Sequence, residues 1–150
     1  VHAPLFAESR KQRDMLMEMA SIREVFDLSR EATVALVGIG SILATGSSYY
    51  DLHPQAQQER ERLVKKGVVA EFMAHLIQED GRLADLSLNS LLVAIEPSAI
   101  ARCKRIIGVA AGDTKVRPVV AALNGGYITS LVTDEDTAQA VLNIWSGAKP

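Results

Sequence analysis

The fold of this chain is decided by residues 105–144, which read R-I-I-G-V-A-A-G-D-T-K-V-R-P-V-V-A-A-L-N-G-G-Y-I-T-S-L-V-T-D-E-D-T-A-Q-A-V-L-N-I. Two apolar stretches, 105–110 and 127–132, each run into a polar or glycine-containing loop and then into a helical segment. We expect these helices over about 115–123 and 134–144. Strands and helices that alternate at this spacing form a parallel sheet with right-handed crossovers. The sequence therefore predicts an α/β domain.

The boundaries of these two helices carry recognisable stop and start signals. Asn124-Gly125-Gly126 is expected to stop the first helix, because glycine adopts the left-handed conformation at low cost. Asp134 is expected to start the second, since a carboxylate at this position satisfies free backbone N–H groups and the helix dipole.

Upstream, residues 33–40 (T-V-A-L-V-G-I-G) are apolar at consecutive positions, which predicts a strand buried on both faces of a parallel sheet. Two helices are expected before it, over 9–19 and from 21 to about 30. Ser21 and Glu24 have the spacing of a capping box for the second helix.

The middle of the chain is less regular. Residues 40–55 predict a loop, 55–66 a charged helix closed by a glycine, and 69–72 a helical turn. Asp80-Gly81 predicts a hairpin-type turn with one or two strands around it.

The bulk composition fits one soluble domain. The 150 residues are 48% hydrophobic and 23% charged with a net charge of −2, which does not indicate nucleic-acid binding. The single cysteine, Cys103, cannot form an internal disulfide and indicates a cytosolic setting. No apolar run is long enough to span a bilayer. The chain has no initiating methionine and is expected to be part of a longer protein.

Ligands of open parallel sheets bind beyond the carboxyl ends of the strands. Gly38 and Gly40 follow the first predicted strand, but Leu43 stands where a dinucleotide fingerprint needs its third glycine. The glycines suit either an approaching phosphate or sugar, or close packing of the backbone, and the residues alone leave both open.

The loop 110–115 (A-A-G-D-T-K) is the stronger candidate. Backbone N–H groups at a helix start attract anions, and Lys115 adds a mobile cation beside Gly112. Alternatively, Asp113 or Thr114 caps the helix and Lys115 is merely solvated. The pattern of nucleotide-hydrolysing P-loops is absent.

The remaining polar candidates are weaker. Glu71 interrupts an apolar stretch, so its carboxylate lies either at the surface or against a ligand. Ser47 and Ser48 could bind phosphate or solvate a turn. His53 and His75 have no metal-ligand spacing, and neither a metal nor a cofactor is expected.

Three segments, 107–115, 119–126 and 131–138, resemble the C-terminal signature of the SorC type of sugar-binding transcriptional regulators. V-G-I-G at 37–40 and G-V-V-A-E at 67–71 occur in that family's order and spacing.

The resemblance implies the C-terminal portion of one effector domain, with a Rossmann-like parallel sheet of the sugar-isomerase or CoA-transferase kind and N-terminally incomplete. It implies that Glu71 and Lys115 contact a sugar or sugar phosphate, with Gly38, Gly40, Ser47 and Ser48 near its ring or phosphate. A helix-turn-helix domain absent from this chain would bind DNA, in a homo-oligomer without a membrane partner.

Departures from the family pattern concern the ligand more than the fold. Ala70 and Glu71 stand where the family commonly has glycine and aspartate, and Ala111 replaces a glycine. The leading hypothesis is a non-catalytic sensor. The alternatives are a sugar-phosphate isomerase or deaminase that uses Glu71 and Lys115, a variant in which Lys115 forms a Schiff base with an aldehyde ligand, and a module for oligomerisation alone.

Overall fold

The computed structural model describes residues 1–43 and 56–145. Within them one mixed sheet has the strand order β3-β2-β1-β4-β5. Its strands are β1 (Val34–Ser41), β2 (Val68–Phe72), β3 (His75–Gln78), β4 (Arg105–Val109) and β5 (Ser130–Val132). The central strand β1 pairs in parallel with β4, which pairs in parallel with β5, whereas β2 and β3 pair antiparallel. The fold is therefore α/β, with an antiparallel hairpin added at one edge.

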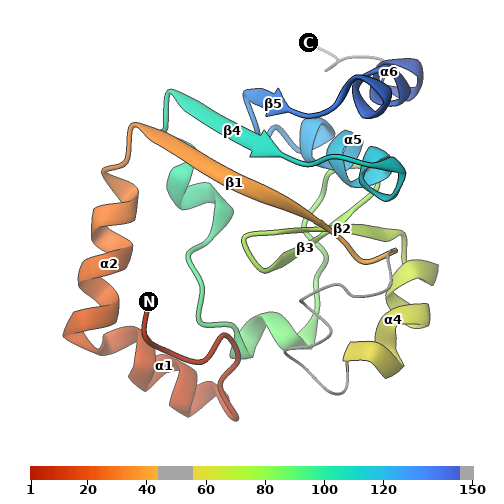
Figure 1. Ribbon diagram of the computed structural model, residues 1–150. Coiled ribbons are helices and arrows are strands. Elements are labelled where there is room, and N and C mark those ends of the chain that lie inside the picture. Colours follow the sequence, from red (N-terminus) through yellow and green to blue (C-terminus); the bar gives the residue numbers. More distant parts are fainter. Residues whose placement is uncertain (44–55, 146–150) are drawn as a thin grey trace.

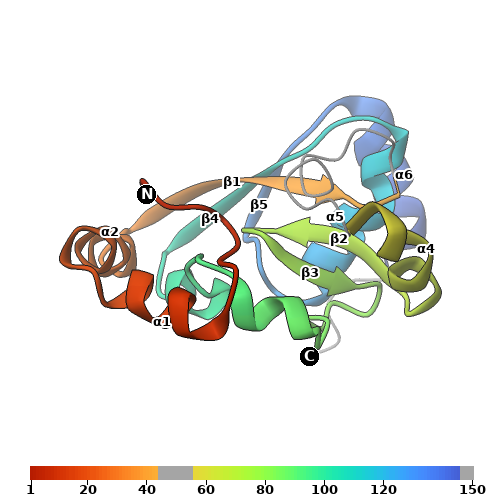
Figure 2. The same ribbon diagram turned by 90° about the horizontal axis from the view of Figure 1, so that it is seen from below.

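Helix α5 packs against one face of this sheet, and the other helices lie around its ends and edges (Figures 1 and 2). They are α1 (Arg10–Glu18), α2 (Ala20–Arg30), α4 (Ala56–Lys65), α5 (Val116–Asn124) and α6 (Glu135–Ile144), with short 3-10 turns at Ser87–Leu91, Pro97–Ile100 and Asp113–Lys115. Figure 1 shows β1 and β4 running side by side in the same direction, with α2 where they begin and α4 near the other end. Among the described residues, no helix combines the length and apolar character needed to cross a membrane.

The strand and helix pattern predicted over 105–144 is confirmed. β4, α5, β5 and α6 follow in that order, although β5 is shorter than the predicted 127–132. Asp134 caps α6 by accepting a hydrogen bond from the Thr137 backbone N–H at 2.7 Å. After α5 the left-handed residue is Gly126, with φ of 67°.

The helical turn predicted at 69–72 is wrong, because these residues form β2. Gly67 ends the turn after α4 with φ of 78°, a conformation that favours glycine. The chain then runs back along the end of β1, and its apolar side chains are buried there. Long-range pairing with β1 has overridden the local pattern.

At the N-terminal side, the one capping prediction is wrong, and a cap forms at a residue for which none was predicted. Ser9 caps α1 by accepting from the Gln12 backbone N–H. The predicted capping box at Ser21 and Glu24 does not form, because α2 already begins at Ala20 and Met19 is its N-cap residue, without a side-chain cap. Only Met19 separates α1 from α2. Helix α2 thus begins one residue before the predicted start at position 21.

Strand β1 is buried on one face only, which corrects the prediction of burial on both. Ile39 is 3% exposed and packs with α5 residues such as Val119 in the main core. On the opposite face Val34 and Leu36 are 54% and 72% exposed.

The main core lies between the sheet and α5, and the end of α6 packs onto it. Trp145, at the C-terminal end of α6, is partly buried against this core. A smaller core joins α4 to the hairpin through Ile42, Leu63, Val68, Leu76 and Ala84. Cys103 is buried, and its Sγ donates a hydrogen bond to the Ala32 carbonyl oxygen.

Candidate functional site

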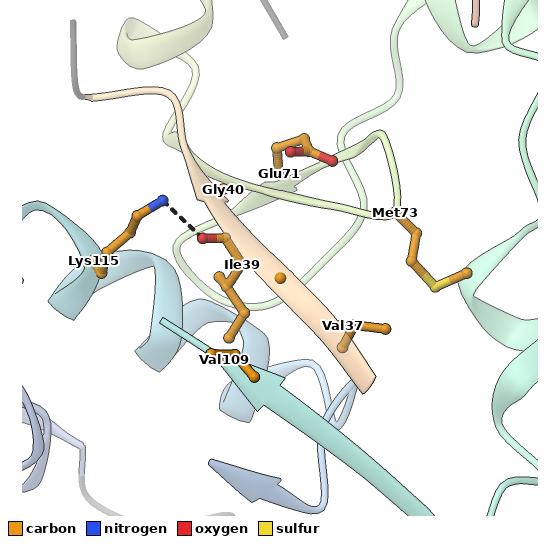
Figure 3. A pocket seen from close by; sticks show the side chains of 8 residues that line it. Val37, Ile39, Gly40, Glu71, Met73, Val109 and Lys115 are labelled. Atoms are coloured by element: carbon orange, nitrogen blue, oxygen red, sulfur yellow. Dashed lines mark hydrogen bonds between the residues drawn. The ribbon is translucent and has the colours of Figure 1, made fainter. Parts of the chain in front are cut away.

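A pocket of about 510 Å³ opens at the carboxyl end of β1, where α/β sheets bind ligands. Its walls come from β1, from the β2–β3 hairpin, from the end of β4 and from the 3-10 turn before α5 (Figure 3). The lining residues are Val37, Gly38, Ile39, Gly40, Glu71, Met73, Val109 and Lys115. Four of the five predicted site residues that the structure describes meet around this strand end, although they come from distant parts of the sequence.

Lys115 reaches the pocket because β1 is longer than its neighbour. The last residue of β4, Val109, pairs with Gly38, and β1 continues to Ser41. Beyond this last pair, the Ile39 carbonyl oxygen accepts a hydrogen bond from Lys115 Nζ at 2.9 Å. The ammonium is thereby held at the pocket wall (Figure 3).

Glu71 approaches from the other side of β1. It is the cross-strand partner of Gly40, so its side chain lies on the same face of the sheet. Gly40 leaves the room for this carboxyl group, since a methyl group in its place would overlap Glu71 Oε2. The Oε1 atom accepts a hydrogen bond from the Ala74 backbone N–H at 2.6 Å.

Burial raises the pKa of the Glu71 carboxyl above its ordinary value of 4.5. The hydrogen bond from Ala74 and the charges of Lys115 and His75 act in the opposite direction, but desolvation is the largest effect. Glu71 is therefore a carboxyl group that takes up a proton more readily than an exposed glutamate does.

The hairpin turn beside Glu71 has an unusual backbone. Met73 and Ala74 connect β2 to β3 with φ of 52° and 66°, the positive values that two-residue hairpin turns need and that glycine or asparagine normally supplies. Hydrogen bonds hold the turn, from the Ala74 N–H to Glu71 and between His75 Nδ1 and the Met73 carbonyl oxygen at 3.0 Å. His75 Nε2 lies 3.3 Å from Glu96 Oε2. This strained turn positions both Met73 and Glu71 at the pocket.

The loop 110–115 is tied to α6 rather than open to a ligand along its whole length. The Gly112 N–H donates to Thr137 Oγ1 at 2.8 Å and to Asp134 Oδ2 at 3.1 Å. Thr137 Oγ1 in turn donates to Asp134 Oδ2 at 2.8 Å. These hydrogen bonds, those from Thr137 foremost, lower the pKa of the Asp134 carboxyl. The expectation that the backbone N–H groups of this loop face a ligand is therefore wrong at Gly112.

The alternative for this loop is also corrected. Neither Asp113 nor Thr114 caps the helix, because the 3-10 turn and α5 both begin without a side-chain cap. Lys115 is half-buried and bonded to Ile39, so it is more than a solvated surface lysine.

The structure brings together Gly38, Gly40, Glu71 and Lys115 in one pocket. Gly112 is not among the lining residues, and Ser47, Ser48 and His53 lie outside the described residues. Sequence reasoning missed four lining residues, Val37, Ile39, Met73 and Val109. Val37, Ile39 and Val109 lie within strands that were predicted, but the Met73 turn has no glycine or asparagine to mark it.

The arrangement suits a small polar ligand. The pocket offers the ammonium group of Lys115 and the carboxyl group of Glu71, which accepts hydrogen bonds. At Gly38 no side chain covers the backbone, so a ligand can approach the main chain directly. A few convergent polar groups in an otherwise apolar hollow are typical of small-molecule sites.

Comparison with known proteins points to one kind of protein. Residues 1–143 match the family described as "Putative sugar-binding domain". The transcriptional regulator LsrR of Enterobacter sp. (strain 638) is 34% identical over 145 residues, which cover 95% of this chain and 45% of LsrR. This chain spans less than half the length of the curated relatives it matches.

Solved structures of transcriptional regulators superpose on this chain. The full-length sorbitol operon regulator SorC from Klebsiella pneumoniae superposes with a TM-score of 0.86 at 25% identity, over 95% of this chain and 46% of SorC. A sugar-binding domain of a transcriptional repressor from Vibrio fischeri gives 0.83 at 24% identity, over 97% and 58% of the two chains, and supports the fold alone.

Proposed function

This chain belongs to the family of sugar-binding domains of SorC-type transcriptional regulators, and from this premise we propose that its pocket binds a sugar or sugar phosphate as a regulatory effector. The observation that carries the proposal is the placement of Glu71 and Lys115 on opposite sides of the carboxyl end of β1. They lie 44 positions apart in the sequence, and only the fold brings them to one pocket.

Each polar group has a role in this proposal. The Lys115 ammonium binds a phosphate or a ring hydroxyl, and the Glu71 carboxyl accepts hydrogen bonds from hydroxyl groups. Gly38 and Gly40 let the ligand approach the backbone of β1. Gly112 acts indirectly, by fixing the loop that carries Lys115. Ser47 and Ser48 would add hydroxyl contacts.

The proposed protein has further parts. Residues 1–150 would be the C-terminal portion of a single effector domain of the sugar-isomerase-like kind, and a separate N-terminal helix-turn-helix domain would bind DNA. The share of LsrR and SorC that the match covers, 45% and 46%, leaves room for both. Effector binding would shift a cytoplasmic homo-oligomer between states of different operator affinity.

Titration calorimetry with a panel of free and phosphorylated pentoses and hexoses tests the binding step. For a ligand that binds, Lys115→Ala is expected to weaken affinity about 10- to 100-fold, since a hydrogen bond to a charged group contributes about 1.5–3 kcal/mol. Lys104→Ala is the matched control. Lys104 is an exposed lysine just before β4, at the opposite end of the strand. Equal losses in both variants, or no binding by any sugar of the panel, would contradict the proposal.

The enzymatic alternatives give different outcomes in the same samples. An isomerase would exchange the hydrogen next to the sugar carbonyl with deuterium from solvent, and a sensor would not. Borohydride would trap a Schiff base on Lys115 as a mass increase. We expect neither signal.

A further inference from the structure

A single peptide group connects the β2–β3 turn to the pocket. The peptide between Met73 and Ala74 donates its N–H to Glu71 Oε1 at 2.6 Å, and its carbonyl oxygen lies 3.0 Å from His75 Nδ1. Because a peptide group is planar and trans, its N–H and its C=O point in opposite directions. Glu71 and His75 therefore hold the two ends of one planar group.

These two contacts decide which way the peptide faces. Positive φ at both Met73 and Ala74, 52° and 66°, is the mark of a type I′ turn. In the related type II′ turn the central peptide is turned over, and only the first of the two residues keeps a positive φ. That conformation would release Ala74 from the left-handed region but would point the carbonyl oxygen toward the Glu71 carboxyl group. The observed orientation thus depends on the two side chains.

His75 is anchored through both of its ring nitrogens. The residue is 4% exposed, and a carbonyl oxygen can only accept, so Nδ1 carries the hydrogen in the contact with Met73. On the other side of the ring, Nε2 lies 3.3 Å from Glu96 Oε2. Only the protonated imidazole has an N–H on each nitrogen, so in that form both contacts are hydrogen bonds. Glu96 thereby fixes the ring that holds the peptide.

We propose that His75 is a positioning residue of the pocket. Held by Glu96, its Nδ1–H keeps the 73–74 peptide with the N–H directed at Glu71, and this N–H seats the carboxyl group. The residues that line the pocket include Glu71 but neither His75 nor Glu96, so both act through the carboxyl group. The inference deepens the proposed function and rests on it, since this carboxyl is the group that would accept hydrogen bonds from a sugar.

Two substitutions separate the two ring nitrogens. The amide nitrogen introduced by His75→Asn can take the place of Nδ1, and the amide nitrogen introduced by His75→Gln can take the place of Nε2. Both substitutions remove the ring and its charge. They therefore share the loss of packing and differ in which hydrogen bond they can keep.

Hydrogen exchange of the Ala74 amide, followed by NMR on the 150-residue chain without any ligand, is the readout. In His75→Asn we expect this amide to exchange within about threefold of its rate in the unsubstituted chain. In His75→Gln it should exchange at least about tenfold faster, because the peptide is free to turn over. The amide of Ala121, a fully buried residue of α5, corrects for any change in global stability. Equal acceleration at Ala74 in both variants would overturn the inference.

Glu96→Ala keeps the inference testable if either His75 variant fails to fold, because the Glu96 side chain is 60% exposed. Loss of the anchor on Nε2 should make the Ala74 amide exchange about three- to tenfold faster. Glu18→Ala is the matched control, since Glu18 is an exposed glutamate on α1, and it should leave the rate unchanged. An unchanged rate in Glu96→Ala would also overturn the inference.

Titration calorimetry with the panel of free and phosphorylated pentoses and hexoses separates this inference from the proposed function. A sugar that binds should lose affinity about tenfold in His75→Gln and less than about twofold in His75→Asn. The expected exchange pattern without binding by any sugar contradicts only the proposed function. Binding together with equal Ala74 exchange in the two variants contradicts only the positioning by His75.

Discussion

At the scale of single residues, Glu71 combines opposing electrostatic effects. Its carboxyl accepts the Ala74 N–H and lies near the charges of Lys115 and His75, yet burial dominates and raises its pKa. Such a group makes stability depend on pH in a defined direction.

The folded protein binds the Glu71 proton more tightly than the unfolded chain, in which the pKa is near 4.5. The contribution of this group to the free energy of unfolding is therefore fully present below pH 4.5 and is lost as pH rises through the higher folded pKa. Glu71→Gln keeps an oxygen for Ala74 but cannot titrate. We expect the difference in unfolding free energy between the two proteins, measured by urea denaturation, to change with pH only in the window above pH 4.5. A constant difference would contradict this.

Thr137 offers a second residue-scale prediction. The residue is 1% exposed, and its Oγ1 accepts a hydrogen bond from the Gly112 N–H and donates one to Asp134. Thr137→Val keeps the shape but removes both bonds, so it should lower the free energy of unfolding by about 1–2 kcal/mol. Thr137→Ser retains the hydroxyl and should lose less. Urea denaturation followed by circular dichroism checks the order, and equal losses would exclude the hydroxyl as the cause.

At the scale of secondary structure elements, the β2–β3 turn is the place where sequence and conformation conflict most. Replacing Met73-Ala74 by Asn-Gly supplies residues that adopt positive φ without strain. The double variant should raise the free energy of unfolding by about 1–2 kcal/mol, since the left-handed conformation costs other residues about that much each and glycine returns part of it as entropy. Denaturant titration measures the gain.

A matched control for this substitution exists at Ala101, which has φ of −60°. Ala101→Gly relieves no strain there and should lower stability by up to about 1 kcal/mol. A loss of stability in both positions would show that the turn is not strained.

The same turn explains what the sequence could and could not predict. The 105–144 pattern is local, because each strand, cap and helix is encoded by neighbouring residues such as Asp134. By contrast, β2 exists through its pairing with the end of β1, and Met73-Ala74 carries no turn signal. The contact of Glu71 with Gly40 depends on that register, so sequence patterns alone, without the family resemblance, could nominate both residues but not their proximity.

At the scale of the whole molecule, one backbone contact joins the β2–β3 hairpin, at one edge of the sheet, to the end of helix α5. Gly81, after β3, packs directly against the backbone of Asn124 and Gly125 at the end of α5. Asn124 Nδ2 also donates to the Glu79 carbonyl oxygen at 3.2 Å, and Arg117 Nε lies 3.0 Å from Glu79 Oε1.

Gly81→Ala should push the hairpin away from α5 and destabilise the protein by about 2–4 kcal/mol. The added methyl group would overlap the Gly125 backbone, and the φ of residue 81 is positive. Gly67→Ala is the control, since Gly67 also has positive φ but a methyl group there meets nothing within 4 Å. It should cost only about 1–2 kcal/mol. Calorimetric melting compares the two, and equal shifts would contradict a steric role for Gly81.

Trp145 has an optical consequence for the whole molecule. It is the only tryptophan of the chain, and its buried Nε1 has no hydrogen-bond partner among the described residues. An indole shielded from water emits at shorter wavelength than a hydrated one. Since α6 begins at the residues that hold Gly112 and ends beside Trp145, the emission of this single fluorophore reports without any label whether the helix behind the Lys115 loop stays docked.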